Sequence, residues 1–267
     1  MSKLDVSDIR GRLKESALAN LDELEIFSSI ASTNTHLMTT AAPAAGRFRV
    51  AIADHQTAGR GRHDRRWIST PGAGLCLSVC YTFASLPAQL PALTLAIGVG
   101  VVAALRQLAI EGVSLKWPND LIALDRKLGG ILTEAQSGGG GGTAVVTGIG
   151  INVRNGEHLE LDLEAGRMLP PIDLEALQAE PPARELLAAT IVNELSSTFA
   201  TFEQEGLAPF EAEWRRHDWL HGKAIAVDMP QQQISGTAAG VDADGALLVD
   251  TEAGRTRVIT GSIVPSS

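Results

Sequence analysis

Residues 113–135 decide the fold class expected for this chain: they read Val-Ser-Leu-Lys-Trp-Pro-Asn-Asp-Leu-Ile-Ala-Leu-Asp-Arg-Lys-Leu-Gly-Gly-Ile-Leu-Thr-Glu-Ala. The stretch contains short apolar runs that predict strands at Val113–Lys116, Leu121–Leu124 and Leu128–Ala135. The last two runs are separated by a very short turn that begins with Asp125 and Arg126. Parallel strands need a long crossover connection, so such a short turn predicts antiparallel neighbours. The expected fold class is therefore α+β with a mainly antiparallel sheet.

Working outward, further apolar runs predict strands at Arg49–Ala53, Gly74–Phe83 and Thr143–Val153. Apolar residues at helical spacing predict a long helix over 90–108 and a second helix over 184–205. A short helix should carry Trp214. Residues 155–183, rich in Pro, Glu and Leu, are expected to form a surface loop, and residues 1–24 a short helix or arm.

From about Trp219 the pattern changes to short strands separated by polar turns. About fifty residues of this kind predict a small β-barrel. The expected domains are thus an arm at 1–24, a main domain at 25–218 and a C-terminal domain at 219–267. The strands expected in the last of these are Ala224–Val227, Ile234–Ala239, Leu247–Val249 and Arg257–Ile259.

The composition limits the function. The chain has 267 residues, 45% of them hydrophobic, which is enough for one sizeable domain and a small one. Its formal net charge of −9 argues against a protein that coats nucleic acid, so an anionic ligand should bind at a local basic patch. No cluster of side chains predicts a metal site.

Cys76 and Cys80 lie on one face of an expected strand, roughly 13 Å apart at about 3.3 Å per residue. A disulfide needs Cα atoms within about 7 Å, so both are expected to be free, buried thiols in a reduced, cytoplasmic setting. The N-terminus lacks the apolar region of a signal peptide. The apolar run Ala92–Leu105 is too short to span a bilayer, so no membrane role is expected.

The most informative motif is residues 56–67, Gln-Thr-Ala-Gly-Arg-Gly-Arg-His-Asp-Arg-Arg-Trp. Glycines at 59 and 61 let backbone amides approach a ligand, and the arginines supply forked donors. Such a loop suits a carboxylate beside a phosphate; a solvated basic turn or an RNA contact is the alternative. The chain has no Gly-Lys-Ser/Thr phosphate loop, and the dinucleotide fingerprint is incomplete.

Four other segments carry polar groups at points of constrained backbone. Pro118 should hold Asn119 and Asp120 on a rigid turn, where they could bind a ribose, an adenine edge or a magnesium–phosphate complex, or could serve only as turn formers. Lys127 beside glycines could reach a phosphate, or could be a surface lysine. Asn152, and the three residues Ser32, Thr33 and Asn34, could contact a ligand or could have structural roles as a core amide and a helix cap.

Taken in order, these segments resemble biotin–protein ligases, also called biotin–[acetyl-CoA-carboxylase] ligases. The resemblance spans roughly residues 27–154, and the Gly-Arg-Gly-Arg loop followed by Lys-Trp-Pro-Asn-Asp is its most specific part. It implies a catalytic domain related to class II aminoacyl-tRNA synthetases and lipoate ligases, with an SH3-like C-terminal barrel. Residues 1–24 are too short for the DNA-binding domain of some members, so a monofunctional enzyme without a DNA partner is expected.

The resemblance implies that biotin and ATP, with Mg²⁺, are the substrates, and that a biotin carboxyl carrier domain accepts the biotin on a lysine. Arg62, Lys127 and Asp120 are the expected catalytic residues. The expected biotin-binding residues are Ser32, Thr33, Asn34, Gln56, Gly59, Arg60, Gly61, Arg62, Lys127 and Gly130. The expected nucleotide-binding residues are Arg60, Arg62, Arg65, Trp67, Lys116, Asn119, Asp120, Lys127 and Asn152. Rival interpretations are a lipoate or octanoyl transferase of the same fold, a silent small-molecule sensor and an RNA-binding module.

Overall fold

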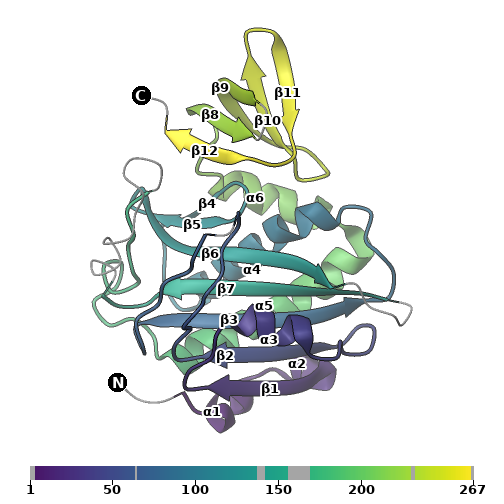
Figure 1. Cartoon of the computed structure of the whole chain (residues 1–267), viewed down its shortest axis with the longest axis vertical. Coiled ribbons are helices and arrows are strands. Elements are labelled where there is room, and N and C mark those ends of the chain that lie inside the picture. The colour runs from purple at the N-terminus through teal and green to yellow at the C-terminus, as the bar shows by residue number, and fades with distance from the viewer. Residues whose placement is uncertain (1–3, 64, 137–141, 156–168, 230–231, 266–267) are drawn as a thin grey trace.

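The structure is a computed structural model that describes residues 4–63, 65–136, 142–155, 169–229 and 232–265 (Figure 1). Its larger part is built on a seven-stranded sheet with the strand order β1-β2-β3-β7-β6-β5-β4. Among these strands β1 and β2 are parallel and every other neighbouring pair is antiparallel, so the expected α+β class with a mainly antiparallel sheet is confirmed. The strands are β1 (Leu21–Phe27), β2 (Phe48–Ala53), β3 (Gly74–Phe83), β4 (Val113–Lys116), β5 (Asp120–Ala123), β6 (Arg126–Gln136) and β7 (Thr143–Asn152).

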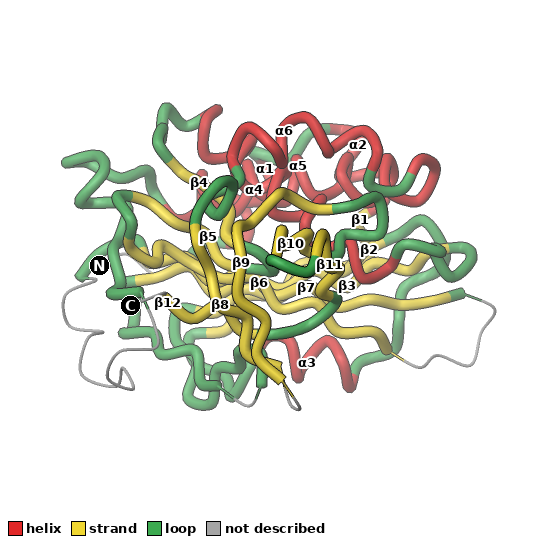
Figure 2. The backbone as a smooth tube through the Cα atoms, turned by 90° about the horizontal axis from the view of Figure 1, so that it is seen from above, coloured by secondary structure: helices red, strands yellow, loops and turns green. Residues whose placement is uncertain are grey.

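Helices cover the two faces of this sheet unequally. Figure 2 shows α3 (Thr33–Thr39) alone on one side of the sheet and the other labelled helices together on the opposite side. Because α3 is the only labelled helix on that side, much of the sheet surface there is not covered by the described helices. The remaining helices are α1 (Val6–Gly11), α2 (Glu15–Asn20), η1 (Leu90–Ala92), α4 (Leu93–Gln107), α5 (Arg184–Glu205), η3 (Ala208–Phe210) and α6 (Glu211–His217).

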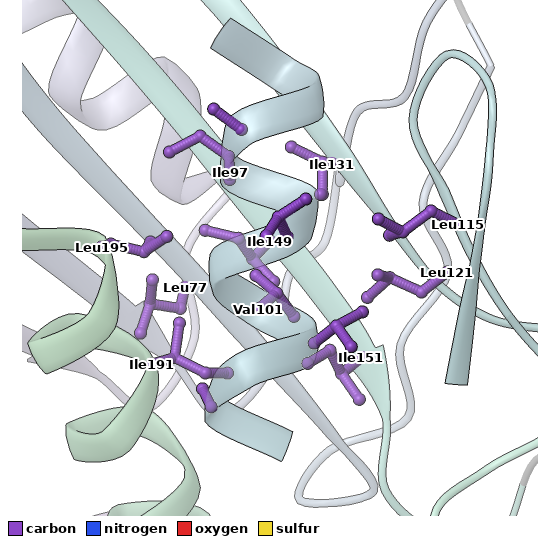
Figure 3. Close-up of a cluster of buried hydrophobic side chains, with 14 of the residues drawn as sticks. Leu77, Ile97, Val101, Leu115, Leu121, Ile131, Ile149, Ile151, Ile191 and Leu195 are labelled. Carbon is purple, nitrogen blue, oxygen red and sulfur yellow. The ribbon is translucent and has the colours of Figure 1, made fainter. Parts of the chain in front are cut away.

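The core lies between the sheet and the pair α4 and α5. Figure 3 shows Leu77, Ile149 and Ile151 of the sheet against Ile97 and Val101 of α4. The helices approach closely because α4 has a glycine at position 100, where a Cβ would lie 2.6 Å from Oγ1 of Thr198. The segment Leu90–Gln107 is apolar and long enough to cross a bilayer by length and composition alone, but 67% of it is buried inside the protein. It is the core helix of this domain.

Where a short helix or arm was expected at residues 1–24, the structure has the short helices α1 and α2, and residues 21–24 begin a strand of the main sheet. The expected boundary after residue 24 falls inside β1, and Leu21 and Leu24 of that strand are buried in the core. Upstream, Nδ2 of Asn193 on α5 donates to the carbonyl of Arg12, and its Oδ1 accepts from the backbone N–H of Lys14. The sequence did not predict β1 because three of its first five residues, Asp22, Glu23 and Glu25, are acidic, as on a solvated helix.

The expected surface loop at 155–183 is corrected in part. Residues 156–168 lie outside the described residues, but the side chains of residues 171–174 are buried. The backbone N–H of Ile172 donates to the carbonyl of Lys127, and that of Leu174 donates to the carbonyl of Asn152. The segment therefore pairs with the ends of β6 and β7, which explains why its apolar residues are not solvated.

The C-terminal domain is a five-stranded antiparallel sheet with the order β11-β10-β9-β8-β12, drawn in yellow and green at the top of Figure 1. Hydrogen bonding among its described strands does not join β11 to β12, so the expected barrel is present as an open sheet. Nε1 of the buried Trp117 donates to the carbonyl of Gly245 at 3.0 Å, which fixes this domain to the main one. The strands are β8 (Ala224–Met229), β9 (Gln232–Val241), β10 (Leu247–Thr251), β11 (Gly254–Val258) and β12 (Ser262–Pro265), the last of which the sequence did not predict.

Candidate active site

A cavity of about 660 Å³ lies on the face of the sheet that carries α3, because Ser32, Thr33 and Asn34 at the start of that helix line it. Its wall comes from the start of α3, the arginine loop (residues 56–67), the turn between β4 and β5, and residues 261–263 of the C-terminal domain. Among the described lining residues Asp120 is the only carboxylate, although the whole chain is acidic. The cationic side chains that line it are Arg60, Arg62, Arg65, Arg66, Lys116 and Lys127. The cavity thus has the charge expected of an anion site.

The register of the sheet explains why the cavity is hollow. Gly130 lies opposite Gly150, Gly150 lies opposite Cys76, and Gly148 lies opposite Ser78, so small residues form a continuous floor across β6, β7 and β3. A glycine inside a strand often marks a close approach. A Cβ at Gly150 would lie 2.5 Å from the ring of Trp67, and a Cβ at Gly148 would overlap with the amide of Asn34.

One end of the cavity is a chain of uncharged polar side chains, which we call the polar end (Ser32, Thr33, Asn34, Gln56 and Ser78). Ser32 caps α3 by accepting from the backbone N–H of Thr35, as expected. The hydroxyl of Ser78 donates to Oδ1 of Asn34 at 2.6 Å and lies 2.7 Å from that of Thr33. Oε1 of Gln56 accepts from the backbone N–H of Thr33 at 2.7 Å. Ser78 gives its one hydrogen to Asn34, so the single hydrogen of the Thr33 hydroxyl goes either to Ser78 or to Oε1 of Gln56, which lies 3.1 Å away and can only accept.

Ser78 was missed by the sequence analysis because it lies inside an apolar run. It is fully buried on β3, two residues from Cys76, and both lie on the cavity side of the strand. The signal was available: alternation along residues 74–83 places positions 76, 78 and 80 on one face. Cys76 and Cys80 are both free and buried, as expected, and burial raises the pKa of each thiol, that of Cys80 to about 11.

The arginine loop is folded on itself beside the polar end. The backbone N–H of Gly61 donates to the carbonyl of Arg65, and that of Trp67 donates to the carbonyl of Gly59. No room exists for a side chain at Gly59, because a Cβ there would overlap with the carbonyl of Trp67. Burial lowers the pKa of Arg62, so its guanidinium is held in a partly desolvated position.

The guanidinium of Arg60 is paired with a carboxylate of the same chain. Its guanidinium donates to both oxygens of Glu134, at 3.0 and 2.8 Å. Of the other arginines of the loop, Arg65 donates to Oγ of Ser262 at 3.4 Å and so contacts the C-terminal domain. The guanidinium of Arg60 thus points to β6.

Two lysines share one carboxylate at the opposite end of the cavity. Oδ1 of Asp120 lies 2.6 Å from Nζ of Lys127, and its Oδ2 lies 3.4 Å from Nζ of Lys116. Burial alone would raise the pKa of Asp120, but the attraction of Lys127 and Lys116 outweighs it and lowers that pKa. Burial lowers the pKa of Lys116, against the attraction of Asp120. A carboxylate with a lowered pKa is a weak base, which counts against Asp120 as the group that removes a proton.

Asn119 and Asn152 have structural bonds in addition to their places in the wall. Nδ2 of Asn119 donates to the carbonyl of Ile131 at 2.7 Å and holds the turn that follows the cis peptide bond before Pro118. Nδ2 of Asn152 donates to the carbonyl of Ile172 at 3.0 Å. Both amide NH₂ groups therefore support the wall, and the carbonyl oxygen of each can accept from a ligand.

The structure brings nearly all of the expected site residues together. Each of them lines the cavity except Gly59, which supports the loop from behind. Asp64 lies outside the described residues. Residues that line the cavity but were not expected there include Cys76, Ser78, Leu169, Pro171, Gly261, Ser262 and Ile263.

Comparison with known proteins agrees with this geometry. Residues 26–152 match the family described as the biotin/lipoate A/B protein ligase family, and residues 220–264 match the biotin protein ligase C-terminal domain. The chain is 33% identical over 255 residues to the bifunctional ligase/repressor BirA of Escherichia coli, covering 93% of this chain and 74% of that protein. It is 34% identical to the biotin–[acetyl-CoA-carboxylase] ligase of Mycobacterium tuberculosis, covering 91% and 88% respectively.

A solved structure supports the same assignment. The biotin protein ligase of Aquifex aeolicus in complex with biotin and ATP has a TM-score of 0.72 and 25% identity, over 91% of this chain and 97% of that one. The family match, the match of the C-terminal domain and the residues that line the cavity all support the same assignment. The chain belongs to the biotin/lipoate A/B protein ligase family, as a biotin protein ligase with the C-terminal domain of that group.

Proposed function

We propose that this protein is an ATP-dependent biotin–protein ligase: it activates biotin as biotinyl-5′-AMP and transfers the biotin to a lysine of a biotin carboxyl carrier domain. One observation carries the proposal. A single cavity has an uncharged, hydrogen-bonding end at one side and a cluster of cations at the other. Biotin has the same polarity, with a ureido ring at one end and a carboxylate at the other.

The polar end fits a ureido ring better than the dithiolane ring of lipoate. Because the hydroxyl hydrogen of Ser78 goes to Asn34 and that of Thr33 goes to Ser78 or Gln56, lone pairs on these oxygens remain to accept from ureido N–H groups. The hydroxyl of Ser32, whose oxygen caps α3, keeps a hydrogen for the ureido carbonyl. A dithiolane offers no such partners and would leave buried polar groups unpaired, which sites of this kind reject strongly.

The cationic end suits a carboxylate that must meet a phosphate. Arg62, Arg65 and Lys127 line this end, and Trp67 is placed on the floor at Gly150, where it can stack on an adenine ring. Among the described residues no group of three or more metal-binding side chains exists, and Asp120 is paired with two lysines. Mg²⁺ would therefore be held mainly by ATP phosphates and water, with Asp120 as the nearby carboxylate, and would supply charge neutralisation.

In the first step a biotin carboxylate oxygen attacks the α-phosphorus of ATP, the new P–O bond forms and pyrophosphate leaves. Two anions must approach, so the barrier is largely electrostatic. Arg62 and Lys127 lower it by preorganised positive charge, and Asp120 holds the Nζ of Lys127 in place. In a partly closed cavity this charge acts more strongly than it does in water.

In the second step a neutral acceptor lysine attacks the carbonyl carbon of the adenylate, an amide bond forms, and AMP leaves. The lysine must lose a proton, and Asp120 is the candidate acceptor in the wall, although its lowered pKa makes it a weak one. The carrier domain as partner, the absence of a DNA partner and a cytoplasmic location stay predictions. The free thiols of Cys76 and Cys80 agree with a reducing location.

The test is pyrophosphate release by the whole chain with ATP and either biotin or lipoate. We expect release that depends on biotin, with lipoate at least about a thousandfold poorer in kcat/KM, because unpaired buried polar groups discriminate by about 10⁴ or more in the best cases. Equal use of lipoate would favour the rival within the family. No release with either acid would contradict a ligase and leave the small-molecule sensor.

A further inference from the structure

Glu134 of β6 joins two parts of the site that are far apart in the sequence. Its Oε2 accepts from Nδ2 of Asn34 at 3.1 Å, and its two oxygens accept from the guanidinium of Arg60 at 3.0 and 2.8 Å. Asn34 belongs to the polar end, whereas Arg60 belongs to the arginine loop. Glu134 itself is not among the residues that line the cavity. One carboxylate behind the wall thus connects the two.

On the side of Asn34, this carboxylate determines which way the amide faces. An amide group can rotate to exchange its oxygen and its NH₂. A carboxylate can only accept, so Glu134 and the carbonyl of Leu132 hold the NH₂ toward β6. The amide oxygen is then left above Gly148, where it accepts from Ser78 at 2.6 Å. The acceptor character of the polar end depends on this orientation.

On the side of Arg60, the carboxylate ties the loop to the sheet. The two N–H···O contacts make this a bidentate pair, in which each oxygen of the carboxylate accepts from a different nitrogen, a strong arrangement for such ions. The pair is partly exposed, at 46% and 22% for the two side chains, so its use is to hold a position and not to stabilise the fold. The backbone bond from Gly61 to Arg65 lies within the loop and cannot anchor it.

We propose that Glu134 is a positioning residue that couples recognition of the ureido ring to closure of the arginine loop, an inference that rests on the proposed function. A ligand that fixes Asn34 also fixes the carboxylate on which Arg60 docks. By reciprocity, a docked loop holds Asn34 ready for the ring. Glu134 touches neither reacting group.

The test compares Glu134→Gln with Glu134→Ala in two measurements. Trypsin cleaves after arginine, so nicking at residues 60–66 of the ligand-free protein reports how often the loop opens. We expect both variants to be nicked about tenfold faster than wild type, since both lose the charged, bidentate contact with Arg60. We expect KM for biotin to rise about tenfold in Glu134→Ala but only about threefold in Glu134→Gln, in which the loop is undocked although the amide oxygen can still accept from Asn34.

The matched control is Glu111→Gln, which changes an exposed glutamate paired with Arg106 away from the cavity and should match wild type in both measurements. Wild-type nicking rates in both Glu134 variants would overturn the proposal, and so would an unchanged KM for biotin in Glu134→Ala. The nicking measurement needs no substrate. Failure of the wild type to release pyrophosphate with biotin would therefore contradict the proposed function. The nicking rates would still show whether Glu134 holds the arginine loop.

Discussion

Nζ of Lys127 lies 2.6 Å from Oδ1 of Asp120, and both side chains are largely buried at the cationic end of the cavity. Asp120 is also 3.4 Å from Nζ of Lys116, so one negative charge serves two positive ones. Asp120 stays ionised at neutral pH, because the attraction of Lys127 and Lys116 lowers its pKa against the effect of burial. Because two lysines surround this one carboxylate, a phosphate beside them would be attracted to the side chains of Lys116 and Lys127.

Asp120→Asn should therefore destabilise the protein. It leaves two ammonium groups close together with no negative charge between them, and breaking a buried pair costs about 3 kcal/mol or more. Asp120 has a lowered folded-state pKa, so it contributes stability that is fully present above the unfolded pKa of about 3.9 and is lost as the pH falls through the folded value. Urea unfolding should show a large difference from wild type at pH 7 that narrows below about pH 4.

The control is Asp8→Asn, which removes an exposed partner of Arg12 and should cost about 0.5 kcal/mol or less. A difference between wild type and Asp120→Asn that stays constant from pH 7 to pH 3 would contradict the electrostatic account.

Lys127→Ala should stop adenylation without unfolding the protein. The side chain is 23% exposed, and the strand is held by backbone bonds to Pro170 and Ile172 that the substitution leaves in place. Loss of one preorganised charge at a developing anion reduces kcat by about 100- to 1,000-fold. Biotin-dependent pyrophosphate release measures this, and Lys14→Ala, at a lysine that is 57% exposed, serves as the control. Adenylate formation at the wild-type rate in Lys127→Ala would remove this lysine from the reaction.

Gly148→Ala should impair biotin binding selectively. A Cβ at this position overlaps with the amide of Asn34, so the amide must shift away from Ser78. Losing one such hydrogen bond to a ligand-orienting group costs about 1.4 kcal/mol, or about tenfold in KM for biotin, with little change in KM for ATP. Initial rates at varied biotin and varied ATP separate the two. Gly11→Ala, where a Cβ meets nothing within 4 Å, should change neither, and an equal rise in both constants would refute the prediction.

The sequence was sufficient to predict β2 to β7 of the main sheet and most of the cavity wall. Apolar runs predicted β3 and β4 with their bounds, and the short turn at Asp125 and Arg126 predicted the antiparallel pairing of β5 with β6. The wall was predictable because the chemistry of residues 56–67 and 116–120 depends on local features, glycine, proline and charge, that a sequence displays directly. Order and resemblance then placed these segments at one site.

What the sequence did not predict depends on contacts between distant segments. The acidic residues of β1 obscure its strand pattern, because Leu21 and Leu24 are buried only in the folded sheet, where β1 pairs with β2. Ser78 is a single polar residue in an apolar run, and its role becomes clear only when the fold brings Asn34 and Thr33 within hydrogen-bonding distance of it. Likewise, nothing local to Glu134 indicates that Arg60, 74 residues away, will pair with it.

Trp117→Phe tests how firmly the C-terminal domain is fixed to the main one. The indole is 2% exposed, and its Nε1 donates to the carbonyl of Gly245 across the domain boundary at 3.0 Å. Phenylalanine keeps most of the packing but leaves that carbonyl without its donor, which costs about 2 kcal/mol and should lower the midpoint of thermal unfolding. Trp214→Phe is a matched control, because Trp214 is equally buried and its Nε1 has no hydrogen-bond partner among the described residues. Removing that donor should cost less. If Trp214→Phe is as destabilising as Trp117→Phe, packing and not the bond to Gly245 holds the two domains together.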